Sequence, residues 1–150
     1  MASPRRFRLE RLLELKAKKE QALAIQLGSA EAAARAAKAE QDALAAMRES
    51  GAEDLSAEGS RRVGDLRPLA ELLDRLDDRL DAQLAHVRHA EKTVDDAQRL
   101  LAVAHQERRV LDRLREKHAE RVRTTDAQTD QKTMDDVAVA RFLRSRPSEL

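Results

Sequence analysis

Residues 66–104, LRPLAELLDRLDDRLDAQLAHVRHAEKTVDDAQRLLAVA, decide the fold because apolar residues recur in them at a spacing of seven. Two such series run in parallel along this stretch. The first contains only aliphatic residues: Leu66, Leu73, Leu80, Val87, Val94 and Leu101. The second begins three residues later and contains a single polar residue: Leu69, Leu76, Gln83, Ala90, Ala97, Ala104 and Leu111. Paired series of this length predict a helix that packs in a left-handed coiled coil.

A weaker version of the pattern occupies the first part of the chain, from about Arg5 to Ser50. Gly28 is the only Gly or Pro within it, so the sequence predicts a first helix there. The seven-residue series is Leu9, Lys16, Leu23, Ala30, Ala37 and Leu44, with Leu12, Leu13, Leu27, Ala34 and Met47 beside it. Residues 30–46 contain ten Ala, which indicates either a small seam that lets the helices approach closely or simple helix propensity.

Residues that break helices separate the two patterns. Three of the four Gly lie at residues 51–64, and Pro68 follows them. Because Gly costs about 1 kcal/mol in a helix interior and Pro about 3, we expect a turn region at about 51–65. Asp65 is a suitable N-cap for the next helix, and Pro is tolerated in a first turn. No further Gly or Pro occurs until the C-terminal end, so the second helix is predicted at about 66–145.

A turn centred near Ala57 would place the two helices side by side in opposite directions. Leu44 would then lie opposite residues 71–73, and Leu9 opposite Gln106. The apolar series of the second helix end soon after that point, where the first helix would no longer be beside it. This agreement favours an antiparallel hairpin over a parallel homodimer.

The predicted fold is therefore all-α, with two long helices forming one antiparallel coiled-coil hairpin over residues 1–150. The helices would lie at about 5–50 and 66–145, and the second would be the longer. Its end, from about Asp112 to Arg146, would extend as an overhang with sparse apolar residues. Helices depend on packing of an apolar face, so we expect a partner to order this segment.

The composition excludes several classes of protein. Charged residues make up 38% of the chain, yet the net charge is +1 and 41% of residues are hydrophobic, which argues against intrinsic disorder. The absence of Cys excludes disulfides and thiolate metal sites. No stretch approaches the roughly 20 apolar residues of a membrane span, and no apolar signal segment follows the basic N-terminus. We therefore expect a cytoplasmic protein.

Chemistry-bearing motifs are absent from the sequence. It contains no Gly-rich phosphate loop and no nucleophile–base arrangement. His86 and His89 are three residues apart on the second predicted helix, but no third metal ligand accompanies them, and solvated His beside a seam is the favoured interpretation. A two-helix hairpin also offers no enclosed pocket. We expect no catalysis, no cofactor, no metal and no small-molecule substrate.

Charge and aromatic residues gather toward the termini. Residues 1–22 hold seven Arg or Lys against three Glu (net +4), and residues 105–125 hold seven against four acids (net +3). Residues 71–81, near the turn, hold two Arg against five acids (net −3). A basic end suits nucleic acid, a membrane or an acidic protein cavity, and the lack of aromatic stacking groups favours the protein; a solvated end without a partner stays open. Phe7 and Phe142, the only aromatics, are either anchors for a partner or caps of the coil.

The two end segments carry a family resemblance. Residues 7–16 read FRLERLLELK, and residues 130–142 read DQKTMDDVAVARF. Both resemble the opening and closing motifs of the flagellar export protein FliJ family, and the length and hairpin layout agree with it over nearly the whole chain.

The resemblance implies a stalk-like component of the flagellar type III protein export apparatus. Its terminal end would enter and activate a hexameric export ATPase, while its turn end, around residues 50–81, would meet the export gate or export chaperones. It would not bind nucleic acid, and it would be cytoplasmic and peripheral at the inner face of the cell membrane. The residues that the resemblance assigns to ATPase contact are Phe7, Arg8, Leu12, Gln131, Lys132, Asp136, Arg141 and Phe142.

Other functions remain open at this point. A stalk subunit of an injectisome or a vacuolar-type ATPase would share the layout. A generic coiled-coil scaffold would use its seam to self-associate. A binder of nucleic acid or of membrane surfaces would show strong salt dependence.

Overall fold

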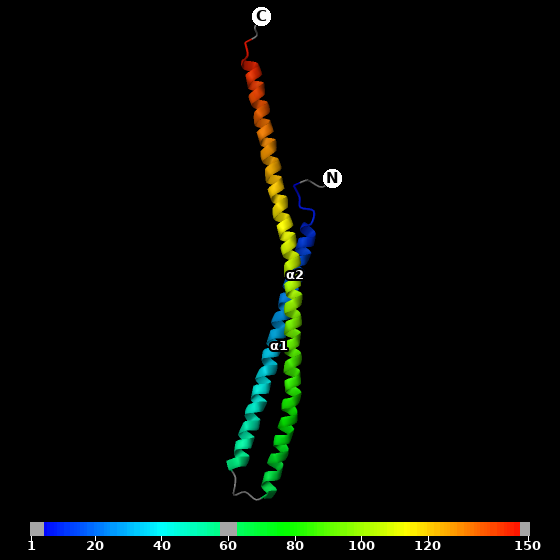
Figure 1. Cartoon of the computed structure of the whole chain (residues 1–150), viewed down its shortest axis with the longest axis vertical. Helices are drawn as coiled ribbons and strands as arrows, with labels where there is room; N and C mark the ends of the chain where they lie inside the picture. The colour runs from blue at the N-terminus through cyan, green and yellow to red at the C-terminus, as the bar shows by residue number, and fades with distance from the viewer. Residues whose placement is uncertain (1–4, 58–62, 148–150) are drawn as a thin grey trace. The chain divides into compact units, whose positions relative to one another are not determined.

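The computed structural model describes residues 5–57 and 63–147. They form two helices, α1 (Glu10–Ala57) and α2 (Val63–Ser145), which pack against each other in opposite directions (Figure 1). The predicted all-α hairpin with a longer second helix is confirmed.

The chain divides into two compact units, and α1 and α2 contribute to both. The hairpin unit is Lys19–Ala104, and the terminal unit combines Met1–Lys18 with His105–Leu150. Because both units use the same two helices, this division does not test the prediction of one domain over residues 1–150, which stays a prediction.

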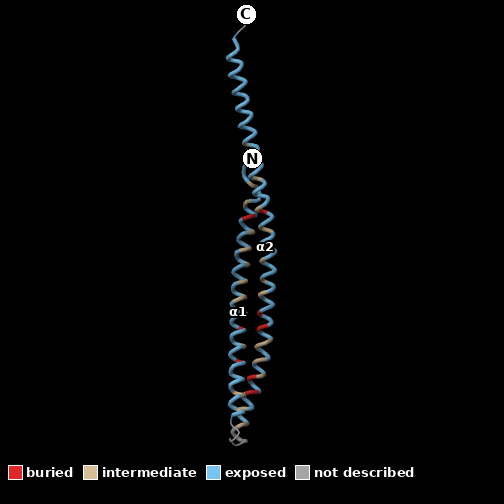
Figure 2. The backbone as a smooth tube through the Cα atoms, turned by 60° about the vertical axis from the view of Figure 1, so that its left-hand side comes forward, coloured by how far each residue is buried: buried red, intermediate tan, exposed pale blue. Residues whose placement is uncertain are grey.

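The core of the hairpin unit lies along the predicted apolar series (Figure 2). Near the connection, Leu44 packs in a cluster with Leu73 and Leu76, which are 5%, 8% and 4% exposed. Further along, Ala37 clusters with Val87 and Ala90. The predicted proximity of Leu44 to residues 71–73 is thus confirmed at Leu73. The core of the hairpin unit therefore consists of a single row of inward-facing side chains on each helix.

Both interpretations of the Ala-rich segment hold, at different residues. Ala37 is 3% exposed and lies against α2, so its small side chain serves close approach. Ala32, Ala33 and Ala36 are exposed, where their contribution is helix propensity. The close approach also explains Gln83, whose amide Nε2 donates to the carbonyl oxygen of Ala37 at 2.8 Å. A polar residue is tolerated in the seam because its amide is hydrogen-bonded to the facing helix.

The helix bounds differ from those predicted. α1 begins at Glu10 rather than Arg5 and continues to Ala57, and α2 already begins at Val63. Residues 51–57 are therefore helical rather than part of a turn, and Asp65 lies within α2 rather than at its N-cap. The remainder of the predicted turn, residues 58–62, lies outside the described residues.

Gly51 explains why the helix passes through the expected turn. It lies seven residues after Leu44, at the same seam position, and a Cβ added there would stand 2.9 Å from Cδ2 of Leu73. The absence of a side chain lets Leu73 fill this place, and its packing offsets the cost of Gly in a helix. Tertiary packing thus overrides local propensity at this position.

The two glycines of α1 give a matched prediction. A Cβ at Gly28 meets nothing within 4 Å, so Gly28→Ala is expected to raise the free energy of unfolding by about 1 kcal/mol through helix propensity. Gly51→Ala should leave stability unchanged or lower it, because the same gain is offset by displacement of Leu73. Urea unfolding followed by far-UV circular dichroism measures both. Equal gains at the two positions would show that the Leu73 contact does not constrain residue 51.

Candidate partner-binding site

The terminal unit is built from the start of the chain lying along α2. Before α1 begins, the carbonyl oxygen of Phe7 accepts from the amide of Glu10 at 3.2 Å, and that of Leu9 accepts from Leu13 at 2.9 Å. These bonds close the first turn of the helix. Leu13 is buried at 5% exposure, and so is Leu111 of α2 at 8%. The seam therefore continues into this unit.

Phe7 packs within its own chain. Its ring lies 5.6 Å from the imidazole of His118, centroid to centroid, at an interplanar angle of 43°. Nε2 of His118 also donates to the carbonyl oxygen of Arg5 at 3.3 Å. Phe7 is half-buried as a result. Of the two roles open for it, the cap of the coil is the one this packing favours.

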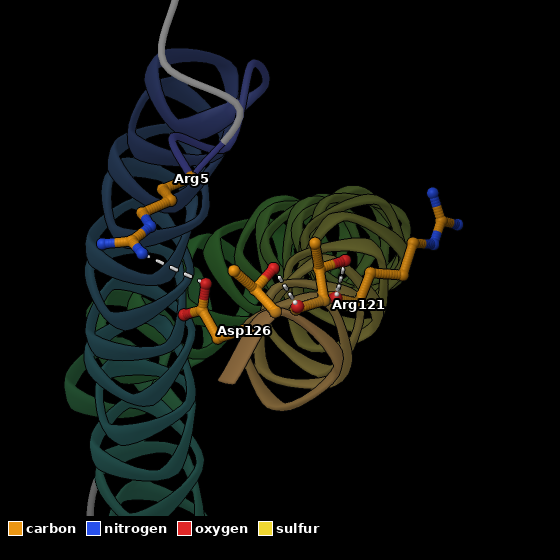
Figure 3. A network of polar contacts seen from close by, with 5 residues as sticks. Arg5, Arg121 and Asp126 are labelled. Atoms are coloured by element: carbon orange, nitrogen blue, oxygen red, sulfur yellow. Dashed lines mark hydrogen bonds and ion pairs between the residues drawn. The ribbon is translucent and has the colours of Figure 1, made fainter. Parts of the chain in front are cut away.

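Ion pairs fix the position of the first segment on α2. Lys16 Nζ lies 2.8 Å from Glu107 Oε2 in a partly buried pair that joins the two helices. Nearer the N-terminus, Arg5 Nη2 lies 3.1 Å from Asp126 Oδ1 (Figure 3). Both pairs are solvent-accessible, so their net contribution to stability is small, and they act mainly on register.

The register in the terminal unit differs from the predicted one. Leu9 was expected opposite Gln106, but its neighbour Glu10 meets Arg115 at 3.5 Å. Contacts of the first segment then reach Asp126, so the overhang does not begin near Asp112 as expected. The cause is the later end of α1: it continues to Ala57 instead of about Ser50, so the connection is centred later than predicted and residues of the first segment meet later residues of α2.

Residues 127–147 form the exposed end of the chain's described part, and every residue in this range is exposed. Thr hydroxyls donate to the carbonyl oxygen four residues earlier at the start of this range and just before it: Thr125 to Arg121 at 2.8 Å, and Thr129 to Thr125 at 2.9 Å. Near its end, the Arg146 guanidinium lies 5.7 Å from the centroid of the Phe142 ring. We call residues 127–147, which are the last part of α2 and the two residues that follow it, the exposed end of α2.

Large apolar side chains project from this exposed end in all directions. They are Met134 (70% exposed), Val137 (43%), Val139 (57%), Phe142 (62%) and Leu143 (61%). At about 100° of helix rotation per residue, these side chains leave no arc wider than about 120° without one of them. The exposed end therefore lacks the single apolar stripe of a helix that packs on one side.

Comparison with protein families adds the deciding observation. The family model described as "Flagellar FliJ protein" matches residues 5–147. The chain belongs to the FliJ family. It is thus a component of flagellar protein export. No curated protein and no solved structure gives a significant match.

The predicted contact residues of this FliJ-family chain lie at two separate places along α2. Gln131, Lys132, Asp136, Arg141 and Phe142 all lie on the exposed end of α2. Phe7, Arg8 and Leu12 lie where the first segment packs on α2, with Arg8 and Leu12 exposed. Phe7 sits beside His118, 24 residues before Phe142, which corresponds to about 36 Å along the helix. The two end motifs therefore do not form one cluster.

Two residues of this FliJ-family chain, His118 and Arg115, make contacts between the helices that the sequence did not predict. His118 carries no motif, and its only sequence signal is its position seven residues after Leu111. Arg115 likewise continues the other apolar series, and it bridges Glu10 to Asp112 at 3.5 and 3.6 Å. Polar residues at seam positions near a helix end are thus the signal for such contacts.

The described part of this FliJ-family chain contains no group of three or more His, Cys, Asp or Glu residues placed to hold a metal ion. His86 and His89 are both exposed. Among the helical residues of the two described ranges, none forms a segment long and apolar enough to cross a membrane.

The two Phe residues give a second matched prediction. Phe7→Ala is expected to lower the free energy of unfolding by about 1 kcal/mol, because it removes the ring contact with His118 and part of the burial. Phe142→Ala should change it by less than about 0.5 kcal/mol, because the ring is 62% exposed. Urea unfolding of both variants checks this. A comparable loss for Phe142→Ala would show that it, too, caps the structure.

Proposed function

We propose that this FliJ-family chain is a stalk-like activator of the hexameric flagellar export ATPase, and that the ring of the ATPase surrounds the exposed end of α2. The observation that carries the proposal is the distribution of apolar side chains on residues 127–147. Its five large apolar side chains point to different sides of the helix, so a partner must contact more than one side to bury them all. Within residues 5–57 and 63–147, nothing covers this segment.

A ring explains the distribution better than a partner lying along one side. A helix bound in a groove presents anchors at spacings of three, four and seven residues on a single face. Met134 and Val139 point in directions about 140° apart, and Lys132 and Arg141 point in opposite directions. A partner on one side would leave half of these residues in water, whereas a central pore contacts all of them.

The part of the hairpin unit near the connection between the helices supports a second proposed contact, with the export gate or export chaperones. Residues 71–81 carry two Arg against five acids, a net charge of −3. Arg48 of α1 pairs with Asp77 at 2.7 Å, and this hydrogen bond, together with the charge of Asp77, raises the pKa of Arg48. Glu71, at the start of this range, pairs with Arg67 of the same helix at 3.7 Å. We propose that this acidic region meets the export gate or export chaperones, with the protein cytoplasmic and peripheral at the inner face of the cell membrane.

The experiment that tests the ATPase role measures phosphate release by the cognate hexameric ATPase with increasing amounts of the full chain. We expect the rate to rise and to saturate as the rings become occupied. Phe142→Ala should shift the saturation to higher concentration, because a central exposed apolar anchor is lost while the helix remains. A rate that does not respond to the intact chain would rule out the activator role.

A further inference from the structure

The side of the terminal unit carries a second apolar surface, separate from the exposed end of α2. Leu12 and Leu15 of α1 are 41% and 58% exposed, and Val110 and Leu114 of α2 are 55% and 39% exposed. We call these four residues the lateral patch. None of them belongs to the buried seam, although Leu13 and Leu111, their neighbours in sequence, do.

Helix geometry places the four residues on the same flank. Leu12 and Val110 each precede a buried seam residue by one position, and in an antiparallel pair such residues lie on the same side of both helices. Residues that follow the seam lie on the opposite flank. The ion pairs show this directly, because Glu10 and Asp112 both follow seam positions and both contact Arg115.

Basic residues border the lateral patch on its own flank. Arg8, Lys117 and Arg121 are exposed, and each of them also precedes a position in the seam series. Among the described residues, no carboxylate pairs with these three side chains. Figure 3 shows the guanidinium of Arg121 directed away from the Arg5–Asp126 pair. The flank is therefore apolar and positively charged.

The opposite flank of the terminal unit carries carboxylates. Its carboxylates at Glu10 and Asp112 are held by Arg115, and Asp112 also meets Arg108 at 3.3 Å. The two sides of the terminal unit thus differ in charge although the whole chain carries only +1. An asymmetry of this kind selects for the charge of whatever covers the apolar side chains.

We propose that the lateral patch docks an amphipathic helix of a partner protein, one whose apolar stripe is flanked by Asp and Glu. Two adjacent helices leave a groove along their flank, and a third helix fills it by packing apolar residues against both. Leu12 and Leu15 are exposed on α1 and Val110 and Leu114 on α2, so an incoming helix would pack against both helices. Arg8, Lys117 and Arg121 then face the acids of the incoming helix.

The charges also decide against other occupants. A second copy of this chain docked in parallel through the same patch would bring Arg8, Lys117 and Arg121 of both copies together, and like charges at an interface are unfavourable. A membrane surface favours a long apolar face along many turns. Within the terminal unit, the lateral patch spans Leu12 to Leu15 on α1 and Val110 to Leu114 on α2, about one turn each.

The test uses the full chain and two labelled amphipathic peptides of equal length and equal Leu stripe, one flanked by Glu and the other by Lys. Fluorescence anisotropy should give at least about tenfold tighter binding of the Glu peptide. Leu15→Gln with Val110→Gln should weaken that binding by about tenfold or more. Ile25→Gln with Leu72→Gln is the matched control, because these residues are also exposed apolar side chains (68% and 49%) but lie in the hairpin unit.

Three results would overturn the proposal. The first is equal binding of the two peptides, or equal loss in the patch and control variants with helix content preserved in both. The second is binding to anionic phospholipid vesicles that the patch variant abolishes while neither peptide binds. The third is a concentration-dependent dimer in sedimentation that the patch variant converts to monomer. ATPase stimulation by the patch variant is measured separately, so the stalk role and the docking role can fail independently.

Discussion

Replacing Leu76 with Ala is expected to lower the free energy of unfolding by about 2–3 kcal/mol, the largest stability effect of any single substitution considered for this chain. Leu76 is 4% exposed and packs with Leu44 and Leu73, while Leu55 and Leu80 border the cluster. Removing its side chain loses buried apolar area and leaves a cavity. We place the effect in the lower part of the range for such changes because water reaches the flanks of a two-helix core.

Leu72→Ala is the matched control for this substitution. Leu72 lies on the same helix but is 49% exposed and outside the cluster. Its replacement should change stability by less than about 1 kcal/mol, since little burial is lost and Ala is a strong helix former. Urea unfolding monitored by circular dichroism compares the two. Similar losses would mean that the core does not lie where the seam places it.

The seam itself could be predicted from the sequence because helix geometry converts spacing into direction. Residues seven apart return to nearly the same side of a helix, so an apolar series must face whatever buries it. Leu73, Val87 and Leu111 are buried as this argument requires, and the polar exception, Gln83, bonds the facing helix. No long-range information is needed for this part of the fold.

The register and the helix ends could not be predicted in the same way. Apolar residues still face the partner helix when the register shifts along the seam, so the series alone does not distinguish Leu9 beside Gln106 from Glu10 beside Arg115. The register depends on where the connection between the helices lies. The predicted position is wrong because Gly51, by its local propensity, indicates a turn, whereas it lies within α1. Its contact with Leu73 is a tertiary effect that local propensity does not contain.

The candidate site shows the same division. The two end motifs predict Phe7 and Phe142 as contact residues alike. They do not show that the Phe7 ring packs on His118, whereas the Phe142 side chain is 62% exposed. Burial depends on the pairing of the helices, and thus on the register. The lateral patch is likewise a product of pairing, because Leu12 and Val110 are far apart in sequence.

Deleting residues 127–150 is expected to abolish stimulation of the export ATPase while the packed part of the chain stays folded. The cut follows Asp126, so the pair with Arg5 is retained, and so is the contact of Phe7 with His118. Every described residue removed is exposed, so the loss of helix signal should correspond to the deleted segment alone. Phosphate release measures the stimulation, and circular dichroism with thermal unfolding measures the remaining structure.

Variants on two sides of the exposed end distinguish a surrounding ring from a one-sided partner. Met134→Gln with Val137→Gln alters one side of the helix, and Val139→Gln with Leu143→Gln alters the other. All four side chains are exposed, so both variants should keep their helix content. If a ring surrounds the segment, each pair reduces stimulation, because each direction of the helix has lost apolar contact with the pore wall. A reduction confined to one pair would mean that the helix lies in a groove and not in the pore of a ring. Full stimulation by the chain that lacks residues 127–150 would mean that the exposed end has no role in activation.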